Sequence, residues 1–153
     1  MMAKRRKVLF VSSSGGHWIQ LRRLRPAFEG WDRHFACTNE GYRSTIDPGE
    51  KFFVIPEASR WNKARLVYQA SAVLWTLLRV RPDVVVSTGA APGFFAMLFG
   101  SQLGRKTIWV DSIANVDELS LSGQQVRRFA DLWLTQWEHL ARPEGPKYFG
   151  SVV

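Results

Sequence analysis

Several residues that define common classes of protein are scarce in this sequence. Cysteine occurs once, at Cys37, which excludes a disulfide framework and a cysteine-based zinc site and favours a reducing compartment. Histidine occurs three times, at widely separated positions, so no cluster of metal ligands is expected. We therefore predict a protein that holds neither a metal ion nor another cofactor.

Long hydrophobic segments are also missing. The apolar run that ends at Ser12 is too short for the core of a signal peptide. Residues 84–104 carry no charged side chain over 21 positions, which is nominally long enough to span a bilayer. The segment Ser87–Gly93 interrupts this stretch with glycine and proline, so a buried strand, a turn and a helix are the better interpretation.

Familiar catalytic fingerprints are absent as well. The sequence contains no Gly-Lys-Ser/Thr after a glycine-rich turn and no G-x-G-x-x-G pattern, which disfavours the usual nucleotide-binding loops. It contains no G-x-S-x-G pattern, which disfavours a serine hydrolase. No pair of carboxylates has a spacing that requires a glycosidase.

Positive charge, by contrast, is in excess and unevenly distributed. Lys and Arg outnumber Asp and Glu by 21 to 13, so the net charge is +8. Residues 1–35 carry eight of these cations and two acids, and residues 60–81 carry five cations and no acid. Such patches are typical of contact with nucleic acid or an anionic membrane surface, or form a solvated face. No base-reading motif accompanies them, so we expect a membrane and no nucleic acid.

Strand-like and helix-like segments alternate along the chain. We expect strands at 7–12, 33–38, 51–55, 83–87, 106–111 and 132–136. We expect helices at 17–27, 62–80, 90–103, 121–130 and 137–142. This alternation predicts a single α/β domain over residues 1–153, with a Rossmann-like, mainly parallel sheet and helices on both faces.

The first strand runs into a turn rich in serine and glycine. The turn Ser12–Gly16 precedes a helix and leaves backbone N–H groups free to bind a phosphate, another anion or a sugar hydroxyl. His17 follows the turn, and its imidazole can exchange a proton near neutral pH. A tight turn with a solvent-facing histidine is the structural alternative.

Three of the predicted strands end in such polar or glycine-rich segments, where open parallel sheets bind ligands. His17 is the first candidate for a catalytic base and Asp111 is the second. The alternatives for Asp111 are to orient His17, to cap a helix or to pair with a basic residue. The residues expected to bind substrate are Ser14, Gly15, Gly16, Gly89, Pro92, Gly93 and Ser112.

The helix predicted after Asn62 has an apolar stem and basic ends. A helix of this kind that also carries a tryptophan suits a membrane interface, and burial of the same stem against the sheet is the alternative. The residues expected at the membrane are Arg60, Lys63, Arg65, Trp75 and Arg79.

Six motifs, taken in order, resemble those of PssD-type bacterial polysaccharide biosynthesis proteins. These are relatives of the membrane-anchoring subunit of the eukaryotic two-subunit N-acetylglucosaminyltransferase of the dolichol pathway. The motifs are Ser13–His17, Ser87–Gly93, Asp111–Ala114, Leu119–Gly123, Gln136–Trp137 and Lys147–Gly150. The first turn is also similar to the Gly-Gly-x-Gly-Gly-His loop of MurG. The family usually has Glu where Asp111 stands and commonly Arg where Asn115 stands.

The resemblance implies the N-terminal half of a GT-B glycosyltransferase, ending about where a one-chain relative would cross to its second half. A separate PssE-like subunit would bind the UDP-sugar, and this chain would bind the anionic membrane and a polyprenyl-diphosphate-linked glycan acceptor. The implied reaction is inverting, metal-independent sugar transfer in surface or exopolysaccharide biosynthesis. Attachment would be peripheral, at the cytoplasmic face of the inner (plasma) membrane. The alternative is a non-catalytic membrane scaffold that recruits the catalytic partner subunit.

Overall fold

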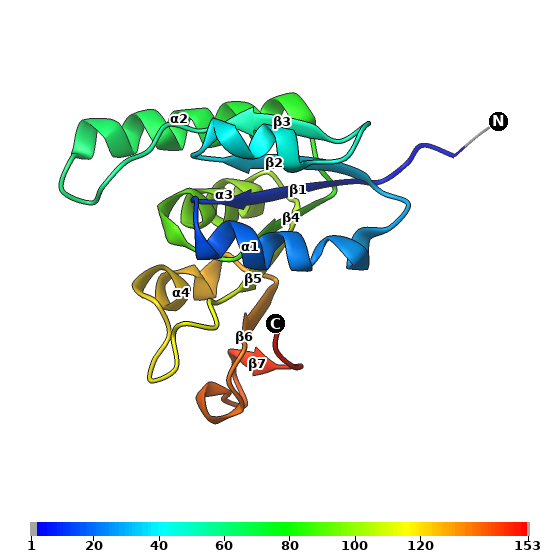
Figure 1. The fold of residues 1–153 in the computed structure, drawn as a ribbon. Coiled ribbons are helices and arrows are strands. Elements are labelled where there is room, and N and C mark those ends of the chain that lie inside the picture. The colour runs from blue at the N-terminus through cyan, green and yellow to red at the C-terminus, as the bar shows by residue number, and fades with distance from the viewer. Residues whose placement is uncertain (1–2, 153) are drawn as a thin grey trace.

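The computed structural model describes residues 3–152, which build one seven-stranded sheet with helices on both faces (Figure 1). The strands are β1 (Lys7–Ser12), β2 (Asp32–Cys37), β3 (Lys51–Val54), β4 (Val84–Ser87), β5 (Lys106–Val110), β6 (Leu132–Thr135) and β7 (Lys147–Tyr148). Their order across the sheet is β3-β2-β1-β4-β5-β6-β7, and every pairing is parallel. The predicted Rossmann-like α/β class is confirmed.

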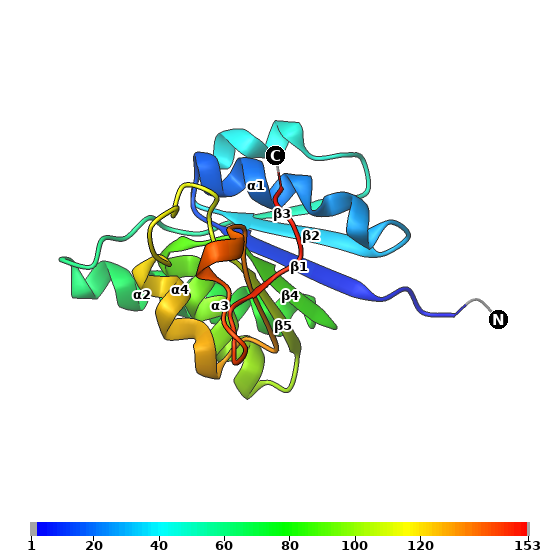
Figure 2. The ribbon, with the colours of Figure 1, turned by 90° about the horizontal axis from the view of Figure 1, so that it is seen from below.

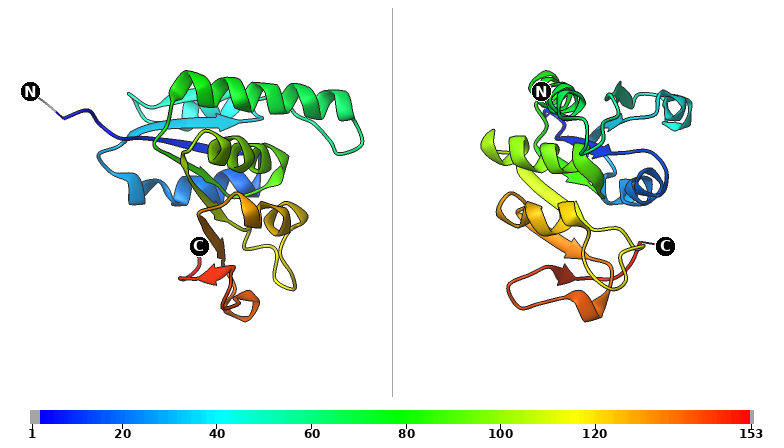
Figure 3. Two further views of the ribbon diagram at one scale, coloured as in Figure 1. Left: turned by 180° about the vertical axis from the view of Figure 1, so that it is seen from behind. Right: turned by 90° about the vertical axis from the view of Figure 1, so that its left-hand side faces the viewer.

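Four α-helices cover the two faces of the sheet unequally. They are α1 (Gly16–Arg23), α2 (Lys63–Val80), α3 (Ala90–Gln102) and α4 (Leu121–Gln125). The right-hand view of Figure 3 shows α1 on one side of the sheet and the other three helices on the opposite side. Each face therefore has its own hydrophobic core.

Strand β1 lies at the centre of both cores. Its apolar side chains alternate between the faces: Val8 and Phe10 pack with Trp18 of α1, whereas Leu9 and Val11 belong to the core under α2 and α3. All four are fully buried, as expected for a strand covered on both sides. Each such side chain contributes about 1.5–3 kcal/mol through burial. Because successive side chains of a strand point to opposite faces, the same alternation determines on which face each polar residue at a strand end lies.

Two predicted helices are shorter than expected. The helix predicted at 17–27 ends as α1 at Arg23, and a 3₁₀-helical segment, Arg25–Phe28, follows. Pro26 explains the change because it has no N–H to continue the α-helical hydrogen bonds. The helix predicted at 121–130 likewise ends as α4 and gives way to a 3₁₀-helical turn.

The C-terminal part departs most from the sequence prediction. The helix predicted at 137–142 is wrong, because only Glu138–Leu140 is helical, as one 3₁₀ turn. The Arg142 N–H instead donates to the Pro146 carbonyl at 3.0 Å and builds a turn that leads into β7. Strand β7 was not predicted, because two residues are too few to show a periodic pattern.

Residues 84–104 form β4, a turn and α3, as the sequence analysis expected. Within residues 3–152, no helix combines the length and the apolarity that crossing a membrane requires.

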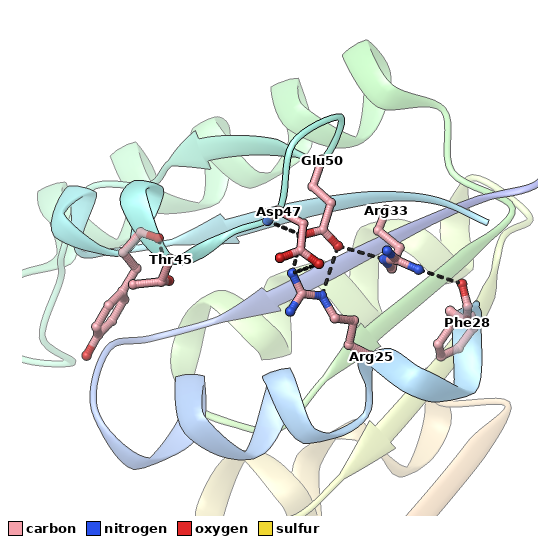
Figure 4. A network of polar contacts seen from close by, with 7 residues as sticks. Arg25, Phe28, Arg33, Thr45, Asp47 and Glu50 are labelled. Atoms are coloured by element: carbon pink, nitrogen blue, oxygen red, sulfur yellow. Dashed lines mark hydrogen bonds and ion pairs between the residues drawn. The ribbon is translucent and has the colours of Figure 1, made fainter. Parts of the chain in front are cut away.

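A cluster of ion pairs joins the segment after α1 to the loop before β3 (Figure 4). The Glu50 carboxylate accepts hydrogen bonds from Arg25 and from Arg33, and Arg25 also pairs with Asp47 at 3.1 Å. Burial alone would raise the pKa of Glu50, but the hydrogen bonds from Arg25 and Arg33 overcome that effect and lower it to about 2. The cluster therefore holds the edge of the sheet together with charges that neutralise one another.

Candidate functional site

The carboxyl ends of β1, β4 and β5 meet at one edge of the sheet, as predicted. Strand β1 pairs with β4, and β4 pairs with β5. The chain order reverses between β1 and β4, which is the position where open α/β sheets bind ligands. Figure 2 shows the start of α1, the start of α2 and the loop 112–120 on this side of the molecule, away from the N-terminus.

Two hydrogen bonds fix His17 to the turn after β4. Its ring Nδ1 lies 3.2 Å from the Thr88 carbonyl oxygen, and the Thr88 hydroxyl donates to the His17 carbonyl at 2.6 Å. A carbonyl oxygen only accepts hydrogen bonds, so Nδ1 carries the proton of the neutral ring and Nε2 carries the lone pair. In this tautomer Nε2 is the ring atom that can accept a hydrogen bond.

Gly89 makes room for the His17 ring. A Cβ at Gly89 would lie 2.4 Å from two ring atoms of His17, which no real contact allows. The next residue, Ala90, has φ 67°, a left-handed conformation that costs a non-glycine residue about 1–2 kcal/mol. The turn after β4 is therefore shaped around His17 and held in a strained form by its surroundings.

The helices α1 and α3 both begin at this edge without a side-chain cap. Neither has a capping hydrogen bond from a side chain among the described residues, and both are preceded by a glycine, Gly15 and Gly89. Two backbone N–H groups of the turn between β1 and α1 are already occupied: Ser14 N–H donates to the Thr38 hydroxyl, and Gly15 N–H donates to the Tyr42 hydroxyl. The N–H groups of Gly16, His17 and Trp18 are the remaining donors at the start of α1, because the Ile19 N–H already donates to the Gly15 carbonyl. The helix dipole favours an anion there.

The predicted residues Pro92 and Gly93 have different surroundings. Gly93 packs against the sheet, where a Cβ would lie 2.0 Å from the Ser87 hydroxyl oxygen. Pro92 lies in the first turn of α3 and lines a cavity. Of these two, only Pro92 lines a cavity, so a role in substrate binding stays a prediction for it.

That cavity has a volume of about 470 Å³ and opens between the starts of α2 and α3. It brings together Ser13 from the first turn, Ala90 and Pro92 from the second, and Asn62 and Arg65 from α2. His17 is not part of its wall, and Gly89, which holds the imidazole, directly precedes Ala90.

Gln69 is a residue of this cavity that sequence analysis missed. It is 1% exposed, and its side-chain amide nitrogen donates to the Pro56 carbonyl at 3.0 Å. Its amide oxygen is buried and has no hydrogen-bond partner among the described residues. An acceptor left without a donor at the wall of a polar cavity is suited to a ligand hydroxyl.

Asp111 is buried and saturated with hydrogen bonds. Its carboxylate accepts from Trp109 Nε1 at 3.0 Å, from the Asn115 side chain at 3.1 Å, and from both the N–H and the hydroxyl of Ser120. Ser120 in turn caps α4 by accepting from Gly123 N–H. The structure therefore joins Asp111 to the loop 112–120 and gives it no hydrogen bond to His17.

Ser112 belongs to a second buried network, which sequence analysis missed. Gln20 of α1 donates to the Ser112 hydroxyl at 3.2 Å and accepts from the Ile113 N–H at 3.1 Å. Gln136, after β6, donates to the Gln20 oxygen at 2.6 Å and to the Asp111 carbonyl at 2.9 Å. These residues are distant in sequence, so only the fold reveals the network.

Helix α2 has one buried face, as the interpretation of burial against the sheet expected, and one exposed apolar face, for which contact with a membrane stays a prediction. Val73 and Leu77 lie in the core, whereas Trp75 is 58% exposed. The exposed apolar residues on and just before this helix are Trp61, Val67, Tyr68, Trp75 and Leu78. The predicted basic residues Arg60, Lys63, Arg65 and Arg79 are all exposed beside them.

Groups of three or more potential metal ligands do not occur within residues 3–152.

The parallel sheet, the strand order and the site at its switch point define a Rossmann-like half of the GT-B type. MurG from Acinetobacter baumannii is similar with a TM-score of 0.69 at 15% identity, over 96% of this chain and 45% of that chain. UDP-N-acetylglucosamine 2-epimerase from Rickettsia bellii is similar with a TM-score of 0.67 at 13% identity, over 89% of this chain and 40% of that chain. At these identities the likeness establishes the fold.

The sequence then identifies the family. Residues 62–152 match the family described as "Oligosaccharide biosynthesis protein Alg14 like", and the chain belongs to it. The UDP-N-acetylglucosamine transferase subunit alg14 of Schizosaccharomyces pombe is 31% identical over 110 residues, which are 68% of this chain and 50% of the relative. The Mus musculus protein of the same name is 28% identical over 96% of this chain and 83% of its own length. The chain thus spans about half of one relative and most of the other.

Proposed function

We propose that this chain is the acceptor- and membrane-binding subunit of a two-component inverting glycosyltransferase. It passes a sugar from a UDP-sugar to a lipid-linked glycan in surface or exopolysaccharide biosynthesis. The names of its relatives favour UDP-N-acetylglucosamine as the donor. The observation that carries the proposal is the contact of His17 Nδ1 with the Thr88 carbonyl at 3.2 Å, which leaves Nε2 free to accept a proton at the edge where two helices begin without a side-chain cap.

The proposed chemistry is a single displacement. His17 Nε2 takes the proton of the acceptor hydroxyl as its oxygen bonds to the anomeric carbon of the sugar. The bond from that carbon to UDP breaks, and its electron pair leaves with UDP. The N-terminal N–H groups of α1 and α3 hold the diphosphate of the acceptor lipid. Asp111 acts as a positioning residue, because three of its four hydrogen bonds come from Asn115 and Ser120 and order the loop 112–120.

The proposed partner is a PssE-like subunit that binds the UDP-sugar. The relatives are named as transferase subunits, which supports a partner polypeptide for this chain. The exposed face of α2 supports peripheral attachment to an anionic membrane, which we place at the cytoplasmic side of the inner membrane.

Variants of His17 in the complex reconstituted with its donor subunit test the proposal. A positioned general base contributes about 10²–10⁴-fold, so His17→Ala should lower kcat by that range. His17→Gln keeps a hydrogen-bonding side chain without a basic nitrogen and should be nearly as slow. Tm and binding of the partner should stay near wild type in both.

His139→Gln is the matched control. His139 is an exposed histidine whose Nε2 contacts the Val116 carbonyl, and glutamine can replace that hydrogen bond. This variant should keep its turnover. Near-normal turnover in both His17 variants would contradict a catalytic role and favour the non-catalytic scaffold.

A further inference from the structure

A second cavity lies at the opposite end of the sheet from His17. Its volume is about 550 Å³, and its wall comes from the starts of β1 and β3, the first half of β2 and the last turn of α2. Lys7, His34, Lys51, Phe53 and Arg79 are in this wall. None of them takes part in the proposed sugar transfer, and only Arg79 also belongs to the residues expected at the membrane.

The register of the sheet explains how the basic residues meet. His34 of β2 pairs directly with Lys51 of β3, so their side chains share one face of the sheet. Lys7 lies on the neighbouring strand, where its Nζ donates to the Val80 carbonyl at the end of α2, 3.2 Å away. Arg79 approaches the same place from the helix. Four separate elements therefore direct polar groups into one hollow.

The charges in the wall do not cancel. Lys7, Arg43, Lys51 and Arg79 oppose a single carboxylate, Glu50. The Glu50 oxygens are already bound by two guanidinium groups outside the cavity wall, as Figure 4 shows. Among the described residues, neither Lys7, Lys51 nor Arg79 forms an ion pair. The cavity keeps an excess of positive charge that an anion would balance.

His34 is the independent indication of a ligand. The residue is only 8% exposed, and its Nδ1 is buried with no hydrogen-bond partner among the described residues. Burial, and next the charge of Lys7, lower its pKa, which is the effect expected inside a positive cavity. A neutral imidazole still carries one N–H, and a buried polar group of this kind is normally paired.

We propose that this cavity binds a phosphate group, as a phosphomonoester or a phosphodiester. Lys51 and Lys7 supply point charges, Arg79 supplies a planar set of N–H donors, and His34 supplies one neutral ring donor. The phosphate has two possible sources, a soluble phosphate ester or the headgroup of an anionic lipid. The second source is close at hand, because the Trp75 ring of the exposed α2 face lies 6.2 Å from the ring of Phe53 in the wall.

Calorimetric titration of the full chain with inorganic phosphate and with glycerol phosphate tests the soluble source. We expect one site, weakened at least about tenfold in Lys51→Gln and in Arg79→Gln, because each loses a charge-assisted hydrogen bond. Lys106→Gln is the matched control: it also removes an exposed lysine at the start of a strand, but outside the cavity wall. It should bind phosphate as the wild type does.

Sedimentation with vesicles tests the lipid source. Vesicles of phosphatidylcholine alone are compared with vesicles that also contain phosphatidylglycerol. A loss of binding to the anionic vesicles that is larger in Lys51→Gln than in Lys106→Gln supports the headgroup, with or without binding of soluble phosphate, because Lys51, unlike Arg79, is not among the residues expected at the membrane. Equal behaviour of all three variants in both assays overturns the proposal. Neither assay measures sugar transfer, so this result is separate from the test of His17.

Discussion

His17 and Gly89 act as a matched pair although 71 positions separate His17 from its hydrogen-bond partner Thr88. The local signal for His17 is strong, because a strand, two glycines and a histidine follow one another in the sequence. The reason for Gly89 is not local: only the fold reveals that a side chain there would overlap the imidazole. Sequence analysis could therefore identify both His17 and Gly89 as candidate site residues, but it could give a structural reason only for His17.

Gly89→Ala should impair catalysis through His17. The new methyl group must push the ring away from the Thr88 carbonyl, so we expect kcat of the reconstituted complex to fall by about 10²-fold or more. Gly104→Ala is the control, since Gly104 has φ 73° and open space around it. It should lower Tm through backbone strain and leave kcat unchanged. Equal turnover of the two variants would contradict the packing argument.

Glu50 predicts a pH dependence of stability. Its pKa is lowered from 4.5 to about 2 in the folded chain, so its contribution is complete above pH 4.5 and is lost as pH falls toward 2. That difference in pKa corresponds to a contribution of about 3 kcal/mol to the free energy of unfolding. Urea unfolding between pH 7 and pH 3 should therefore show a decline that Glu50→Gln lacks.

Glu40→Gln provides the comparison for this experiment. Glu40 forms an exposed pair with Arg43 at 3.7 Å, an interaction of the kind that contributes little. This variant should follow the wild-type pH profile. A wild-type profile in Glu50→Gln would mean that the buried cluster does not supply the acid sensitivity.

At the scale of elements, the strands of four or more residues and the α-helices could be predicted, although α1 and α4 are shorter than expected, whereas the two-residue strand β7 could not. Helix α2 begins after Asn62, whose side chain accepts from the Arg65 N–H at 3.1 Å, as the capping signal indicated. Strand β7 forms by pairing with β6, and Tyr42 of the 3₁₀ segment Glu40–Thr45 stacks on Trp18 and accepts from the Gly15 N–H, so both depend on distant parts of the chain. The loop 112–120 is similar, because the partners of Asp111 can be recognised only after folding.

The exposed face of α2 predicts how the chain attaches to membranes. Trp75→Ala should weaken binding to anionic vesicles about tenfold or more, because insertion of that side chain contributes about 2 kcal/mol. Each basic residue near an anionic surface contributes about 1 kcal/mol to binding. Salt screens this attraction and should therefore weaken the binding of every variant. Phe149→Ala removes an aromatic side chain that is 75% exposed and lies near the C-terminus, and it should bind as the wild type does. Resistance of the bound protein to both salt and alkaline carbonate would contradict peripheral attachment.

At the scale of the whole molecule, one edge of the sheet carries all the parts proposed for catalysis. Alone, the chain should not transfer sugar, because its donor site is proposed to lie on the partner. An assay with several UDP-sugars and membrane lipid extract should show turnover only after the donor subunit is added. Robust turnover by the isolated chain would contradict the two-component arrangement.

Helix α2 touches both cavities, and this has a mechanical consequence. Arg65 lines the cavity near its start and Arg79 lines the one near its end, about 21 Å apart at 1.5 Å per residue. A domain that contacts a membrane only through the exposed apolar side chains of α2 could rotate about the axis of that helix. A lipid phosphate bound in the cavity near Arg79 would prevent this rotation, because it would fix to the membrane a second point that lies off the helix axis. In the proposed arrangement, the cavity near the start of α2 would then keep one orientation toward the membrane that holds the proposed acceptor lipid.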